Sequence, residues 1–180
     1  YNCFKAADVS GNTVSRRLFR GKTRKEAFMT DKIDMKSMNL SELIAFMEGL
    51  GEKTFRAKQI YQWIHEKRVD RFEEMTNISK KLIETLHEKA YLTALKKEEV
   101  QISKQDGTRK YLFLLEDGNV IESVLMRYKH GNSVCISSQV GCRMGCRFCA
   151  STLDGLERNL TASEMLDQIY AIEGLTGERV

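Results

Sequence analysis

The chain has 180 residues, of which 42% are hydrophobic and 30% are charged, a composition that fits one globular domain or slightly more and excludes a disordered or fibrous protein. No apolar run approaches the ~20 residues that a membrane-spanning helix needs, and an odd number of cysteines, five, without a signal peptide argues for the reducing cytoplasm over a secreted disulfide scaffold. The net charge of +4 comes from the first 28 residues, because residues 29–180 hold 22 basic and 23 acidic side chains, so overall charge does not predict nucleic-acid binding by the body of the protein.

Residues 1–28 form a basic extension with seven Lys or Arg and two acidic residues, and they lack a sustained apolar period. Codons for residues 25–29 can contain a ribosome-binding signal placed directly before an ATG for Met29. We therefore expect the extension to be non-native and the natural N-terminus to lie at or just after Met29.

Residues 29–95 have the pattern of a small helical domain. Asn39 and Glu42 are placed as a capping box for the first helix, which Gly49 and Gly51 should end. Apolar residues at helical spacing mark three helices, with Ser79 as the cap of the third: Leu40, Leu43, Ile44 and Met47; Ile60, Trp63 and Ile64; Leu82, Ile83 and Leu86.

The second predicted helix combines basic and aromatic side chains. The basic residues are Lys53, Arg56, Lys58, Lys67 and Arg68, and the aromatic ones are Phe55, Tyr61 and Trp63. One interpretation is contact with RNA phosphates and bases, and the other is a solvated helix face over an apolar core. Trp63 fits the core better than base stacking.

From about Val100 the pattern becomes extended, and residues 111–115 and 120–126 flank a turn over residues 116–119. This arrangement is typical of a β-hairpin, within a connector that we place at residues 96–131. A further strand is expected over residues 134–139, and a helix capped by Thr161 with Glu164 three residues on.

Three cysteines lie between these last two elements. Cys142, Cys146 and Cys149 have the spacing C-x3-C-x2-C, and Phe148 directly precedes the last one. A cubane four-iron cluster takes one thiolate per iron, so three cysteines would leave one iron open for a ligand that is not protein. The alternative is a structural zinc site, which needs a fourth protein ligand; the candidates are Cys135, His130 and Cys3.

The cysteine run and its neighbourhood resemble the RlmN family of radical S-adenosylmethionine (SAM) RNA methyltransferases. The similar stretches are residues 49–59, 118–124 and 135–161, within a region of about residues 35–180. The resemblance implies an α+β N-terminal part that leads, at residues 132–180, into the first β/α unit of an α/β TIM-like barrel. It also implies that the [4Fe-4S] cluster on the three cysteines binds SAM and reduces it to a 5′-deoxyadenosyl radical, with Phe148 beside the cofactor.

The same resemblance gives two further residues catalytic roles. Glu122, twenty residues before Cys142, matches the carboxylate that accepts a proton from the adenine, and a carboxylate suits that task. Cys135, seven residues before Cys142, matches the thiol that resolves the RNA–protein intermediate through a transient disulfide bond. The methyl-carrying cysteine of the family lies near its C-terminus and is absent from these 180 residues. From spacing alone, Glu122 also fits a solvated strand residue and Cys135 a buried one.

The resemblance therefore predicts an enzyme fragment from a protein that methylates C2 of adenine in 23S rRNA and in tRNA. Its expected partners are these RNAs and an electron donor such as flavodoxin or ferredoxin, and it is expected to be a monomer. The sequence ends before the second barrel strand, so we expect the fragment alone to hold no stable cluster and to be inactive. Two alternatives stay open: a Cfr-type enzyme that methylates C8 of the adenine, and a non-catalytic RNA-binding module with structural zinc.

Two smaller features complete the expectations. For Gly155 and residues 156–160, the resemblance implies a role in shaping the cluster pocket or the approach of RNA. Within this segment, Arg158 and Asn159 are expected to make local hydrogen bonds rather than to catalyse. His65, His87 and His130 show no pairing that suggests catalysis, and we expect structural or solvated roles for them.

Overall fold

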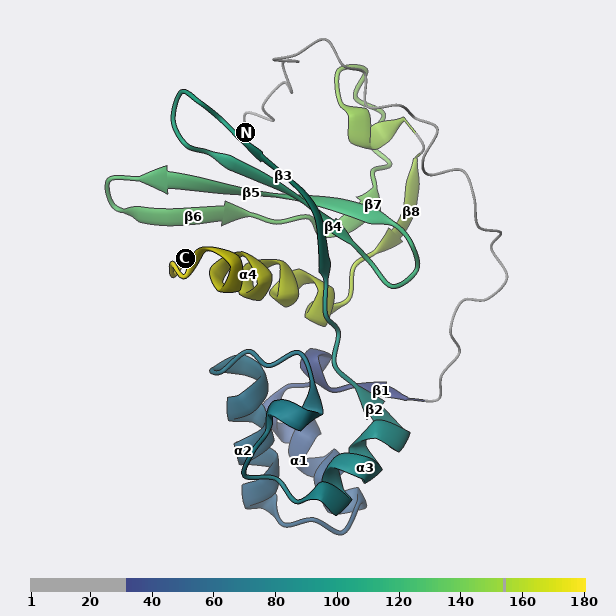
Figure 1. Ribbon diagram of the computed structural model, residues 1–180. Helices are drawn as coiled ribbons and strands as arrows, with labels where there is room; N and C mark the ends of the chain where they lie inside the picture. The colour runs from purple at the N-terminus through teal and green to yellow at the C-terminus, as the bar shows by residue number, and fades with distance from the viewer. Residues whose placement is uncertain (1–31, 154) are drawn as a thin grey trace.

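The computed structural model describes residues 32–153 and 155–180. These residues form a helical unit, a four-stranded antiparallel sheet, a loop between two short strands, and a long helix that lies between the sheet and the helical unit (Figure 1). The basic extension, Met29 and Cys3 lie outside the described residues, so the expectations about them stay predictions. Within the described residues, no helix is long and apolar enough to cross a membrane.

The helical unit contains the three predicted helices: α1 (Leu40–Gly49), α2 (Thr54–His65) and α3 (Lys80–Lys89). The 3-10 turn η1 (Met35–Ser37) precedes α1, and η2 (Phe72–Glu74) lies between α2 and α3. At the two ends of the unit, β1 (Ile33–Asp34) pairs in parallel with β2 (Ala90–Tyr91). The apolar positions that predicted the helices supply its core, including Leu43, Met47, Ile60, Ile64, Leu82 and Leu86.

Local capping explains where these helices begin. The Asn39 side chain accepts from the Glu42 amide at 3.0 Å, and the Glu42 carboxylate accepts from the Asn39 amide at 2.8 Å, which is the predicted capping box. The Ser79 hydroxyl accepts from the Leu82 amide at 3.4 Å, as predicted for the third helix.

The sheet has the order β3-β4-β5-β6, and all its neighbours are antiparallel. Its strands are β3 (Lys96–Ile102), β4 (Arg109–Leu114), β5 (Val120–Tyr128) and β6 (Gly131–Cys135). The predicted hairpin is β4 and β5, closed by bonds from the Leu115 amide to Asn119 O and from the Gly118 amide to Leu115 O. The sheet continues beyond residue 131, where we had placed the end of the connector.

The continuous strand expected over residues 134–139 is wrong. Cys135 ends β6, residues 136–138 belong to no strand, and β7 (Gln139–Gly141) pairs instead with β8 (Leu156–Asn159). Alternating apolar residues could not reveal this break, because side-chain contacts with a distant helix replace the strand pairing there. All described strand pairs after Tyr91 are antiparallel, so the start of a parallel barrel stays a prediction.

Helix α4 (Ala162–Thr176) covers one face of the sheet (Figure 1). It begins at the predicted Thr161–Glu164 capping box and ends at Gly177, whose φ of 67° is the left-handed conformation that glycine adopts without strain. Ile172 of α4 packs into a core with residues of the sheet and its flanks: Tyr111, Phe113, Leu115, Ile121, Leu125, Val140 and Leu160.

Candidate functional site

The three predicted cluster ligands lie on one loop. Cys142, Cys146 and Cys149 are half-buried free thiols between β7 and β8, and the loop projects from the ends of these two strands (Figure 1). Phe148 is 76% exposed. Its ring is therefore available to a ligand on the loop and contributes nothing to the protein core.

The base of this loop is closed by a close backbone contact. The Cys142 amide donates to Gly155 O at 2.9 Å. Gly141 has a φ of 72°, and a Cβ atom on it would lie 2.0 Å from Gly155 O. Only glycine meets both conditions, so Gly141 is required for the first cysteine to leave the strand in this direction.

Thr152 organises the interior of the loop. Its hydroxyl lies 3.0 Å from Cys146 O and 2.9 Å from Cys149 O, and its amide donates to Cys149 O at 3.3 Å. The Cys149 amide in turn donates to Cys146 O at 3.0 Å. The sequence analysis gave Thr152 no role; a threonine three residues after a cysteine in a turn-rich loop was the available signal.

The donor set of this loop fits an iron–sulfur cluster with an open iron. It offers three thiols from one short segment, which is one fewer than a cubane has irons. Among residues 32–153 and 155–180, no group of three or more His, Cys, Asp or Glu side chains is placed to hold a metal ion, and this includes the three loop cysteines. Of the proposed fourth zinc ligands, Cys135 and His130 lie at the two ends of the β6 region rather than on the loop.

Glu122 and Cys135 lie on the same face of the sheet, which is the face opposite α4. On β5, Ile121, Ser123 and Leu125 are buried whereas Glu122 is exposed. Val124 pairs with Cys135 of β6, so Cys135 is the diagonal neighbour of Glu122 on that face. Both side chains are exposed, which removes the buried interpretation of Cys135.

The Glu122 carboxylate has one described ionic partner. Lys110 of β4 lies 3.4 Å from it, and this lysine is only partly exposed. The exposed carboxylate is accessible to a ligand, and a carboxylate is a suitable proton acceptor.

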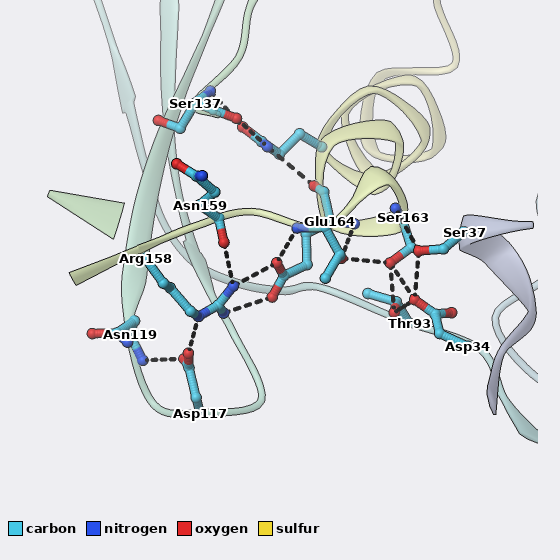
Figure 2. Close-up of polar contacts among 12 residues, drawn as sticks. Asp34, Ser37, Thr93, Asp117, Asn119, Ser137, Arg158, Asn159, Ser163 and Glu164 are labelled. Carbon is cyan, nitrogen blue, oxygen red and sulfur yellow. Dashed lines mark hydrogen bonds and ion pairs between the residues drawn. The ribbon is translucent and has the colours of Figure 1, made fainter. Parts of the chain in front are cut away.

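Arg158 of β8 joins three elements near the cysteine loop (Figure 2). Its guanidinium binds Glu164 at the start of α4 with bonds of 2.8 and 2.7 Å, and Asp117 in the β4–β5 turn at 2.6 Å. Burial alone would raise the pKa of Glu164, but the bonds from Arg158 and the Thr161 amide lower it overall.

Asn159, the next residue of β8, also has a local partner: Gln139 donates to the Asn159 side chain at 3.0 Å. These contacts confirm local hydrogen-bonding roles for Arg158 and Asn159.

The three histidines have structural contacts. His65 shares a hydrogen bond with Tyr170 of α4 at 3.0 Å, and His87 lies 2.6 Å from the Glu73 carboxylate. The ring of His130 stacks on Tyr128.

Some of the basic and aromatic side chains in and after α2 are bound to other parts of the protein, and others are not. Arg68 forms an ion pair with Glu173 of α4 at 2.6 Å, so it is a structural residue. Trp63 is partly buried and packs against the core, which agrees with the core interpretation. Its ring nitrogen donates to Asn77 at 2.6 Å. Lys67 lies over the Trp63 ring with its ammonium nitrogen 3.5 Å from the ring centroid. Lys67 therefore presents its charge beside an aromatic ring. The Arg68 guanidinium also lies near an aromatic ring, 5.6 Å from the centroid of Tyr170, but it is paired with Glu173.

A buried polar interface joins the helical unit to α4. The Lys36 ammonium, which is completely buried, lies 2.5 Å from Asp167, and Asp167 also accepts from the Leu95 amide at 2.7 Å. Next to this pair, Asp34 accepts hydrogen bonds from the hydroxyl groups of Ser37, Thr93 and Ser163 (Figure 2). Sequence reasoning missed all of these residues.

Comparison with known proteins places this arrangement in a class. Residues 33–92 match the model of the ribosomal RNA large subunit methyltransferase N-terminal domain. A radical SAM methyltransferase from Sphaerobacter thermophilus has a similar fold, with a TM-score of 0.74 and 36% identity over 82% of this chain and 44% of that one. The described fold, with its three-cysteine loop, is thus that of the N-terminal part of a radical SAM methyltransferase.

Curated relatives define the family within this class. The chain is 64% identical over 147 residues to a protein of Lachnospira eligens, and 62% identical over 152 residues to one of Lachnoclostridium phytofermentans. Each is named a probable dual-specificity RNA methyltransferase RlmN, and the matches cover 82% and 84% of this chain. The chain belongs to the RlmN family. It spans less than half the length of these relatives, 42% and 43%.

Proposed function

We propose that the full-length protein is a radical SAM methyltransferase that methylates C2 of adenine in 23S rRNA and in tRNA. The observation that carries this proposal is the three-thiol loop, which is closed at Gly141, together with a sheet face that carries an exposed carboxylate and an exposed thiol. The family relatives, named for dual-specificity RNA methylation, support the choice of reaction.

Cys142, Cys146 and Cys149 would hold the [4Fe-4S] cluster, with Phe148 beside the bound cofactor. When bound, the cluster supplies the electron that cleaves SAM reductively, and an external donor such as flavodoxin or ferredoxin replaces that electron. The Thr152 hydroxyl and the Gly155 carbonyl fix the backbone from which the three thiolates extend.

Glu122 and Cys135 act on the RNA adduct. The Glu122 carboxylate accepts the proton that the adenine ring must lose to regain aromaticity after the new carbon is attached. The Cys135 thiolate then attacks the sulfur that links the adenine to the methyl-carrying cysteine: a sulfur–sulfur bond forms, the carbon–sulfur bond breaks, and the released carbon takes a proton. The thiolate sulfur and the thioether sulfur are together oxidised by two electrons, and the released carbon is reduced by the same two electrons to a methyl group. An external thiol must reduce the disulfide before the next turnover.

Cysteine substitutions test the proposal in the anaerobically purified full-length protein. Cys142→Ala, Cys146→Ala and Cys149→Ala should each abolish iron–sulfur absorption and RNA methylation, because each removes a ligand. Cys135→Ala is the matched control: it should keep about four irons per chain yet accumulate an RNA–protein adduct. Stoichiometric zinc in a wild-type protein that lacks iron would refute the proposal.

Nucleoside analysis of the product separates the two enzymatic possibilities. RNA treated with the wild-type protein should release 2-methyladenosine on digestion. Release of 8-methyladenosine would assign the protein to the Cfr type of reaction instead. Treatment of 23S rRNA and of tRNA in separate reactions tests the two substrates independently.

A further inference from the structure

Residues 136–138, which connect Cys135 to β7 and the cysteine loop, are held by side-chain hydrogen bonds and not by strand pairing. The β5–β6 ladder ends at the Val124–Cys135 pair, so the next position would place Ser137 opposite Glu122. The strands do not pair there. Instead the Ser137 hydroxyl donates to the backbone oxygen of Glu122 at 2.7 Å.

Gln168 of α4 takes the place of a neighbouring strand at this point. Its side-chain oxygen accepts from the Ser137 amide at 2.8 Å, and its side-chain nitrogen donates to the Ser137 oxygen at 2.9 Å. The two remaining bonds go to the Ser123 hydroxyl at 2.8 Å and the backbone oxygen of Glu164 at 3.0 Å.

All four hydrogen-bonding positions of the Gln168 amide are therefore used, and the side chain is completely buried. A buried amide that satisfies both backbone groups of another residue fixes that residue, because moving either one leaves buried polar groups without partners. No other described side chain bonds to both backbone groups of Ser137.

The helix that carries Gln168 is itself attached to the other end of the cysteine loop. Glu164, one turn before Gln168, binds Arg158 of β8, the strand into which the loop leads. Ser137 precedes the loop and Arg158 follows it, and Figure 2 shows both beside the first turns of α4. The first two turns of α4 thus hold both chain segments that enter and leave the loop.

We propose that Gln168 is a positioning residue that sets the place of Glu122 and Cys135 relative to the cysteine loop. It acts through Ser137, which is bonded to Glu122 on one side and leads to Cys142 on the other. The inference rests on the proposed function, because the catalytic value of this spacing depends on Glu122 and Cys135 acting on an adduct formed at the loop.

Gln168→Met tests this role in the full-length protein, because methionine keeps the length of the side chain and removes all four bonds. Ser123→Ala is the matched control: it removes one bond of the same buried amide and leaves both bonds to Ser137 in place. Ile172→Val, one turn further along α4, reports on loss of packing alone. Ser137→Ala provides a milder disturbance, since it removes only the bond to Glu122 O.

Two measurements decide the question. Hydrogen–deuterium exchange of the apo-protein should be about tenfold faster at residues 136–138 in Gln168→Met, as expected for loss of roughly one buried hydrogen bond, and unchanged there in Ser123→Ala. In the holoenzyme, Gln168→Met should still form 5′-deoxyadenosine, but the yield of methylated adenine per 5′-deoxyadenosine should fall about tenfold or more. Ser137→Ala should show a smaller fall, and the two controls none.

Equal yields per 5′-deoxyadenosine in Gln168→Met and Ser123→Ala would overturn the positioning role, even if both variants were less stable. Unchanged exchange at residues 136–138 would overturn it independently of any activity. A wild-type protein that forms no 5′-deoxyadenosine would instead contradict the proposed function, and the exchange measurement would still decide whether Gln168 holds Ser137.

Discussion

The two sides of α4 are held by different forces. Towards the sheet, Ile172 enters an apolar core, and the partly buried Met165 and Ala171 pack against the same core. Towards the helical unit, the contacts come from Ser163, Asp167, Tyr170 and Glu173, each bonded to a polar partner. The first side is a conventional protein core, and the second is an interface of charges and hydrogen bonds.

The polar contacts determine how the helical unit is oriented. Apolar burial stabilises without strong directional preference, whereas a buried ion pair must have correct geometry to offset the cost of removing both charges from water. The sheet side therefore supplies most of the stability of the α4 attachment. The polar side fixes one orientation of the helical unit relative to α4.

Lys36→Met should have the largest effect on stability. It leaves the buried Asp167 carboxylate without its cation, and loss of one partner of a buried pair costs about 3–5 kcal/mol. Urea unfolding of the apo-protein measures the change. The double variant Lys36→Met with Asp167→Leu should recover much of the loss, because the second partner of Lys36, Asp70, is exposed and no unpaired charge remains buried. A double variant less stable than Lys36→Met would show that the pair is not the cause.

Ile172→Ala probes the opposite side of the helix and should cost about 3 kcal/mol, the amount typical of a cavity at a fully buried aliphatic residue. Ile172→Val is the graded control and should cost about 1 kcal/mol. No second substitution on the polar side should restore this loss. Such a rescue would contradict the division of α4 into two independent faces.

Arg68 offers a smaller effect on the polar side, with a control at the same position. Arg68→Ala removes the ion pair with Glu173 and should cost roughly 2 kcal/mol. Arg68 has a φ of 58°, a conformation that costs side chains with a Cβ roughly 1–2 kcal/mol. Arg68→Gly should therefore be less destabilising than Arg68→Ala in the same unfolding experiment. The reverse order would mean that the backbone at this residue is not strained.

His65 should give the polar side a pH dependence that the sheet side lacks. Burial lowers the pKa of His65, and the nearby Lys36 charge lowers it further. The unfolded chain then binds a proton more readily than the folded one below pH ~6.5, so stability is lost as pH falls from that value towards the folded pKa. Tm should fall more between pH 7.5 and 5.5 in the wild type than in His65→Gln. Equal falls would remove His65 as the cause.

Local signals were sufficient for part of this structure. The capping boxes at Asn39 and Thr161 and the Ser79 cap predicted helix starts, because the residues that form them are three positions apart. The cysteine spacing identified the loop for the same reason. Such a pattern can be recognised in the sequence because it depends only on residues that are close together in the chain.

Contacts between distant residues were not visible in this way. Lys36 looks like any surface lysine until Asp167, 131 positions later, accounts for its burial. Gln168 and Ser137 are 31 positions apart, and their bonds replace a strand pairing that the pattern of residues 134–139 had suggested. The missed features are those in which a polar side chain is buried because of a partner on another element.

The closed base of the cysteine loop also has a consequence for protein engineering. The bond from the Cys142 amide to Gly155 O joins the two ends of the loop, and the contact at Gly141 leaves no room for a side chain. Because the ends are fixed together, residues between them can be added or removed at a small entropic cost, with each doubling of loop length costing about 0.6 kcal/mol. A graft of this loop onto another antiparallel strand pair should therefore carry both glycines with it.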